Sequence, residues 1–174
     1  GNFLALTFDY MCLSFSALQI KEWNEGVFSM SPAMAAALSI SICQIADLLG
    51  MMAMPSIGRH IKGQLLMAVS AIIVIVSNGM CFITGSAAVM ILMRFFAGVG
   101  TAGIKQVRNM VISQGYSSEA QRNANLAASN NGVIGGLLCG MGLGGVVAGV
   151  FGYQATFLVA AIGHIMYLIF EAGC

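Results

Sequence analysis

Charge is what this sequence most lacks. Only 7% of its residues are Asp, Glu, Lys or Arg, whereas a typical soluble domain carries about 25%. So few charged groups cannot cover a surface exposed to water, which excludes an ordinary soluble domain. The net charge of +1 offers no excess positive charge for a phosphate backbone, so we expect no nucleic-acid partner.

Recognisable chemical motifs are also missing. The five cysteines form neither a CxxC pair nor a metal-binding spacing, and four of them lie in apolar segments, where a thiol packs as a small hydrophobe. The sequence contains no nucleophile–base pair, phosphate loop or zinc spacing. We therefore expect no metal, no cofactor and no enzymatic activity.

Apolar residues dominate the composition. They make up 59% of the chain, and the mean hydropathy is +0.90. Counted in segments of about 20 residues, the sequence predicts six membrane spans, at 2–20, 32–56, 64–84, 87–112, 124–149 and 154–171. Ser31 as N-cap and Pro32 at the first helical position mark the start of the second span. The predicted fold is an all-α membrane protein of six transmembrane helices with short loops.

The ends and loops of the chain predict its context. The chain is apolar from residue 3 and has no basic segment or cleavage site of a signal peptide, so we expect a piece of a longer protein. Basic residues concentrate in the loops on one side of the bilayer, which by the positive-inside rule is the cytoplasmic side. They are Arg59, Lys62 and Arg122, against Lys21 beside Glu22 and Glu25 on the other side. Both ends are then cytoplasmic.

A stripe of small residues runs along the fifth span. Glycines 132, 136, 140 and 144 recur every four residues, and Gly145 widens the stripe. Four residues advance a helix by about 400°, so these positions share one face. In lipid, such a face lets two helix backbones approach closely. The stripe predicts a helix packed tightly against a neighbour.

The fourth span carries three cations, Arg94, Lys105 and Arg108. Relative to Arg94, Lys105 lies at about +20° and Arg108 at about −40° on a helical wheel, so all three share a face. A cation in the bilayer costs several kcal/mol and rarely faces lipid, which predicts a wet cavity or acidic partners. Lys105 and Arg108 have the alternative of reaching the head groups.

The acids available at depth are Asp9 and Asp47. We expect one of them to pair with Arg94, and the surplus positive charge to help bind an anion. Asn130, Asn131 and Gln44 are candidates either for substrate hydrogen bonds or for ties between helices. His164 is a candidate proton relay or a simple hydrogen-bonded side chain.

Four segments resemble motifs of the major facilitator superfamily of secondary transporters. They are RFFAGVGTA (94–102, with Gly98), SSEAQRNANLAAS (117–129), GLLCGMGLGG (136–145) and GYQATFLVAA (152–161). In the fifth-helix motif, Met141 replaces a frequent proline. The loop between the second and third spans keeps Gly58 and Arg59 of the family pattern but has Pro55 at its Asp.

This resemblance implies one six-helix half built of two inverted three-helix repeats, with a second half elsewhere in the chain. It places Asp9, Tyr10, Arg94 and Lys105 at a central cavity between helices one and four. The implied function is transport of a small solute, such as an organic anion or drug-like compound, by alternating access in a bacterial inner or plasma membrane. Asp9 or Asp47 would carry a coupling proton. The alternative is a membrane sensor of the same fold, attached to a signalling domain, that binds ligand without moving it.

Overall fold

The computed structural model describes residues 2–24, 27, 29–115 and 118–172, and its regular structure there is helical throughout. The helices are α1 (Asn2–Trp23), α2 (Pro32–Gly58), α3 (Gly63–Ile83), α4 (Ala87–Gly115), α5 (Glu119–Phe151) and α6 (Tyr153–Ala172). All six are long and apolar enough to cross a membrane. The chain is therefore an all-α, multi-pass membrane protein, as its composition predicts.

Several helices run further than the expected spans. α5 begins at Glu119, five residues before the expected start at 124, and α2 continues through Pro55 to Gly58. Pro55 has no N–H, so the carbonyl of Met51 loses its helical donor, but this break comes in the last turn, where α2 is about to end. At the start of α2 the expected cap is present, since the Ser31 hydroxyl accepts a hydrogen bond from the backbone N–H of Met34.

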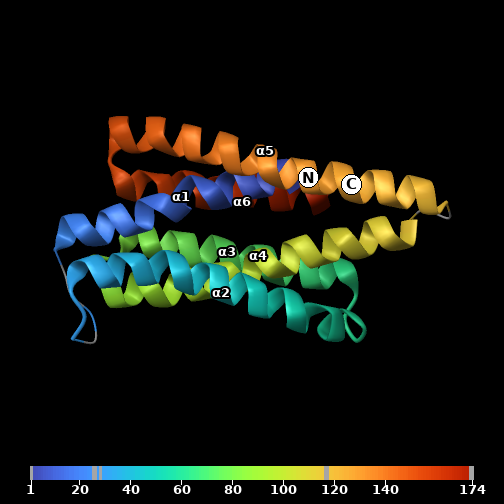
Figure 1. The fold of residues 1–174 in the computed structure, drawn as a ribbon, viewed down its shortest axis with the longest axis horizontal. Helices are drawn as coiled ribbons and strands as arrows, with labels where there is room; N and C mark the ends of the chain where they lie inside the picture. Colours follow the sequence, from blue (N-terminus) through green and yellow to red (C-terminus); the bar gives the residue numbers. More distant parts are fainter. Residues whose placement is uncertain (1, 25–26, 28, 116–117, 173–174) are drawn as a thin grey trace.

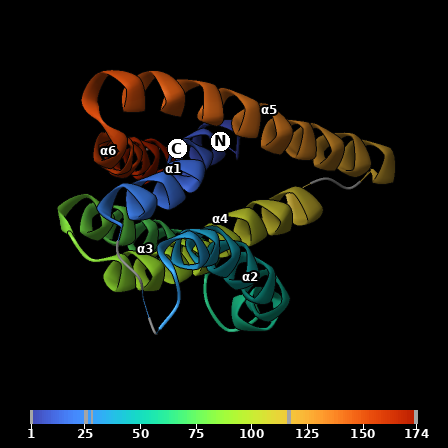
Figure 2. The same ribbon diagram turned by 60° about the vertical axis from the view of Figure 1, so that its left-hand side comes forward.

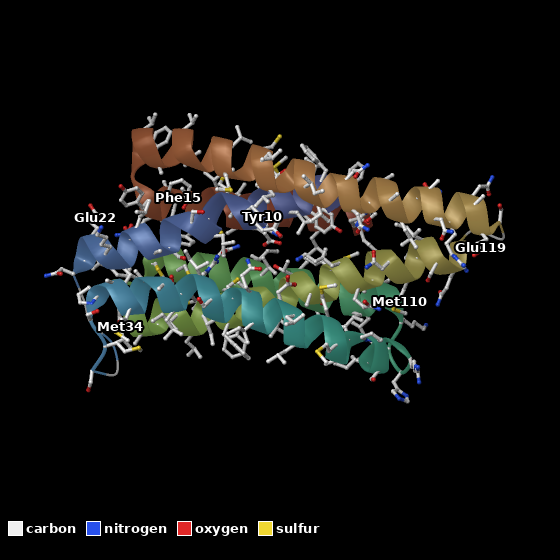
Figure 3. The ribbon with its side chains drawn as sticks, viewed as in Figure 1. Tyr10, Phe15, Glu22, Met34, Met110 and Glu119 are labelled. Carbon is white, nitrogen blue, oxygen red and sulfur yellow. The ribbon has the colours of Figure 1, made fainter. Side chains whose placement is uncertain are left out.

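The helices form two layers (Figure 2), in which α1 packs with α5 and α6, and α4 packs with α2 and α3. Further contacts of α3 with α6 and of α1 with α2 join the layers. The connections α2–α3 and α4–α5 lie at the same end of the bundle (Figure 1). We call this the basic end because it carries Arg59, Lys62 and Arg122. Glu22 and Met34 mark the opposite end, as Figure 3 shows.

The glycine stripe of α5 packs on α1. A methyl group added at Gly136 would lie 3.0–3.1 Å from backbone and side-chain atoms of Phe3, Leu6 and Thr7. Gly140 and Gly144 are buried against the next turns of α1 in the same way. Gly132 is looser, because its nearest neighbour would be 3.6 Å away, and Gly145 has nothing within 4 Å. The close contact between α5 and α1 is therefore formed by Gly136, Gly140 and Gly144.

A second close contact joins α4 to α2. A methyl group on Gly98 would lie 2.9 Å from Cβ of Ala46 and 3.1 Å from the backbone nitrogen of Asp47. This glycine lets the backbone of α2 approach α4 at the level of Asp47. The glycine of the fourth-helix motif thus sets the distance between the two helices that carry the ion pair described next.

Candidate functional site

One ion pair within the span region joins α2 to α4. Nζ of Lys105 lies 2.6 Å from Oδ2 of Asp47, and the two side chains are only 13% and 15% exposed. The second carboxylate oxygen, Oδ1, is buried and has no hydrogen-bond partner among the described residues. Breaking a buried pair by removing one partner costs about 3–5 kcal/mol, and partial exposure reduces that figure here. The pair is therefore stable yet within reach of a ligand.

Asp9 is held between α4 and α6. Its Oδ2 accepts a hydrogen bond of 3.0 Å from the Thr101 hydroxyl. Its Oδ1 lies 3.3 Å from Nε2 of His164, which is fully buried. On the other side of the ring, Nδ1 of His164 lies 2.8 Å from the Ala160 carbonyl.

The partners of His164 fix where its protons are. The Ala160 carbonyl can only accept, so Nδ1 carries a hydrogen. In a neutral ring Nε2 would then be an acceptor facing a carboxylate oxygen, and two acceptors repel each other. The contact between His164 and Asp9 is favourable only when one of the two groups carries an additional proton. Nε2 of His164 makes no hydrogen bond with any described residue, so the pair is a close electrostatic contact inside the bundle.

Arg94 pairs with neither acid, so the predicted contact with Asp9 or Asp47 is wrong. Its side chain is buried, only 2% exposed. One terminal nitrogen donates to Oδ1 of Asn78, and the other donates to Sγ of Cys12 at 3.3 Å. Its Cζ atom lies 5.2 Å from the centroid of the Phe157 ring. A cation–π contact of this kind is worth about 2 kcal/mol when desolvated, which offsets part of the cost of burying a charge without a carboxylate.

Arg108 has an acidic partner that the sequence reasoning did not count. It donates to the carboxylate of Glu171 and to the hydroxyl of Tyr167, both on α6. Arg108 and Glu171 also line a cavity of about 330 Å³ whose other wall comes partly from α5, so Arg108 has both an acidic partner and a cavity beside it. It ties α4 to α6 towards the basic end of the bundle.

Two small cavities meet at Lys105. One, of about 20 Å³, is enclosed by α1, α2 and α4 and is lined by Asp9, Tyr10, Asp47, Arg94 and Lys105, with Gln44 beside them. Figure 3 shows Tyr10 midway along the bundle. The other cavity, of about 230 Å³, lies between α2, α4 and α5 and is lined by Met51, Lys105, Asn109, Ser129, Asn130 and Val133. The predicted residues of helices one, two and four thus come together.

Other predicted residues lie apart from this centre. Asn130 and Asn131 are both exposed on α5, and of the two only Asn130 lines the larger cavity. Arg59 is exposed in the α2–α3 connection, and a methyl group on Gly58 would touch the sulfur of Met110 at 3.0 Å. Gly58 thus belongs to a contact between the end of α2 and α4, 11 residues along α2 from Asp47.

Comparison of the chain with protein-family models and with curated proteins gives no match. The likeness to the major facilitator superfamily therefore depends on the sequence motifs, and function must be argued from the geometry of this centre.

Proposed function

We propose that the chain is one six-helix half of a secondary active transporter of the major facilitator type, which moves a small solute by alternating access. The observation that carries the proposal is the cluster of ionisable groups inside the bundle. The pairs Asp47–Lys105 and Asp9–His164 lie beside one small cavity. Ionisable side chains at this depth are costly in a bilayer, and in membrane proteins they mark ion and substrate pathways.

The helix packing supports the implied inverted repeats. Exchanging α1 with α4, α2 with α5 and α3 with α6 turns the pair α1–α5 into α4–α2, and the pair α3–α4 into α6–α1. All four of these pairs are in contact. The same exchange maps α1–α2 onto α4–α5, which also touch. Such a correspondence is what two three-helix repeats related by a two-fold axis in the membrane plane would produce.

The charge distribution supports an orientation and a location. With the basic end in the cytoplasm, as the positive-inside rule requires, both chain ends lie on the cytoplasmic side of a bacterial inner membrane or a plasma membrane. The partners of the chain would be a small solute, a coupling proton, the lipid bilayer and a second six-helix half.

A membrane sensor remains the second candidate because of Pro55. The family pattern has an acidic residue at this position, and here the proline lies within α2. Among the described residues, no ion pair involves the neighbouring Arg59. A loop that departs from the family's gating pattern at Pro55 is compatible with a protein that binds its ligand without moving it.

Transport is tested by solute counterflow in proteoliposomes that contain the full-length protein. Vesicles are loaded with unlabelled organic anions, organic cations or sugars, and accumulation of the labelled compound is followed. Counterflow of one class that disappears in the variant Asp47→Asn/Lys105→Gln supports a transporter. Saturable binding of a compound without counterflow would refute transport and favour the sensor.

A further inference from the structure

The cavity between α2, α4 and α5 has the chemistry of an anion site. Its polar lining residues are Lys105, Asn109, Ser129 and Asn130. The side chains of Lys105, Asn109 and Asn130 can donate hydrogen bonds, and none of the residues that line this cavity is acidic. Its volume of about 230 Å³ is below the roughly 300–1,000 Å³ of sites for drug-sized ligands. The cavity therefore suits a small anion.

Lys105 is shared between this cavity and its present partner. The ammonium group contacts Oδ2 of Asp47 at 2.6 Å, and the same side chain lines both cavities. Oδ1 of Asp47 is buried and unpaired among the described residues, so that oxygen has room for a proton. An anion that enters beside Asn109 and Asn130 competes with Asp47 for the one ammonium group.

Charge balance determines whether Asp47 takes up a proton when an anion binds. The ion pair is neutral, and the other cation of this centre, Arg94, is held by Asn78 and Cys12 about 16 Å further along α4. An added anion beside Lys105 would therefore leave the ion pair with one net negative charge. An uncompensated charge in such surroundings costs several kcal/mol. A proton on Asp47 restores neutrality, because the anion then forms the ion pair with Lys105 and the aspartic acid is uncharged.

We propose that this cavity binds a small carboxylate anion on Lys105 and that Asp47 takes up one proton from water in the same event. The only covalent bond formed is the O–H bond of Asp47, and the proton comes from the solvent. The inference rests on the transporter function proposed above and names its substrate class and its coupling residue.

Asp47 is a better proton acceptor than Asp9 in this event. Asp9 already lies 3.3 Å from Nε2 of His164 and accepts a hydrogen bond from Thr101. The charged and titratable groups around Asp47 come from three helices, namely Lys105 and Arg94 from α4, Asp9 and Tyr10 from α1, and Cys43 from α2 itself. The described wall from α5 contributes only amide, hydroxyl and apolar groups. Of these groups, only Lys105 pairs directly with Asp47, and the anion would take the place of Asp47 in that pair.

The test is calorimetric titration of the purified full-length protein with sodium acetate, propionate and benzoate. Acetamide, propionamide and benzamide, which have similar shapes but no charge, are the matched control ligands. Titrations in two buffers with different ionisation enthalpies give the number of protons taken up. We expect one proton per carboxylate bound, and an apparent Kd that rises about tenfold for each pH unit once Asp47 is ionised in the free protein. The amides should not bind.

Variants separate the two parts of the proposal. Asp47→Asn should bind the carboxylate without proton uptake, and Lys105→Gln should lose at least tenfold in affinity. Asn130→Leu leaves the ion pair intact, so it tests the cavity even if the charge variants fold poorly. It should weaken binding while one proton is still taken up. Lys21→Gln, at the exposed end of α1, should behave as the unaltered protein.

The outcomes distinguish this inference from the proposed function. Carboxylate binding without proton uptake, proton uptake that persists in Asp47→Asn, or no binding of any of the three carboxylates would overturn the inference. Counterflow of another class of solute would leave transport standing. Proton-linked binding without counterflow would refute transport but support the site.

Discussion

The two faces of α5 allow a stability prediction with an internal control. We compare Gly140→Ala, on the face against α1, with Gly142→Ala two residues further on. A methyl group at position 140 would lie 3.1 Å from the backbone nitrogen of Met11 and from Cβ of Tyr10, and it would also collide with the Thr7 carbonyl. At position 142 nothing lies within 4 Å.

The magnitude follows from what the two substitutions share. Both replace glycine by alanine inside the same helix, so the helix-propensity gain of about 1 kcal/mol cancels in the comparison. Overpacking against a backbone that cannot move aside costs about 1–3 kcal/mol, and only Gly140→Ala incurs it. For a chain of this size, 1 kcal/mol shifts the melting temperature by about 2–4 °C. Gly140→Ala should therefore melt roughly 2–12 °C below Gly142→Ala.

The assay is size-exclusion chromatography of the solubilised full-length protein after heating to a series of temperatures. Gly145→Ala, also in open space, is a second control and should resemble Gly142→Ala. Equal melting temperatures at positions 140 and 142 would show that α5 does not pack on α1 through this stripe.

Three further predictions concern the buried charges. Arg94→Met keeps the volume of the side chain and removes its charge. This variant should leave the free energy of unfolding unchanged or raise it, because replacing buried ionic groups by apolar ones is often neutral or stabilising. A loss above about 3 kcal/mol in thermal unfolding would contradict this. Asp9→Asn can donate to Nε2 of His164 and should stay within about 1 kcal/mol of the unaltered protein, whereas Asp9→Leu should lose about 1–3 kcal/mol; equal losses in the same assay would argue against a shared proton. A double-mutant cycle of Arg108→Gln and Glu171→Gln should give a coupling energy of about 0.5–3 kcal/mol, and strictly additive losses would mean that the two side chains do not interact.

Composition and local signals were sufficient to predict the fold. Low charge and six apolar runs predicted six membrane helices, and Ser31 with Pro32 marked the start of α2 correctly. Helix ends were less certain, because polar residues such as those at 119–123 continue a helix beyond the apolar part of a span. Local sequence carries little information on where a helix leaves the bilayer and continues in water.

The partners of the charges were predicted less well, because a helical wheel gives direction but no depth. Arg94 and Lys105 share a face of α4, yet they are 11 residues apart, about 16 Å along the axis. They therefore cannot share a partner. Counting residues from the end of the bundle at which two spans both begin or end would have identified the correct partners. Asn78 lies five residues before the end of α3, and Arg94 lies seven after the start of α4.

The same count identifies the partner of Arg108. Glu171 lies 18 residues after the start of α6, and Arg108 lies 21 after the start of α4. The two helices run in the same direction, so these side chains are at similar depth. Counting only Asp9 and Asp47 as acids at depth left Arg108 without an acidic partner.

The turn between α5 and α6 has a consequence for how the protein is made. Gly152 alone joins the two helices, with a φ of +84° that favours glycine. The start of α6 thus stays within about 7 Å of the end of α5. With the basic end in the cytoplasm, as proposed above, α5 cannot span the bilayer during synthesis while α6 remains on the ribosome side. The two helices enter as one hairpin, and the glycine stripe of α5 meets α1, made more than a hundred residues earlier, only when that hairpin docks.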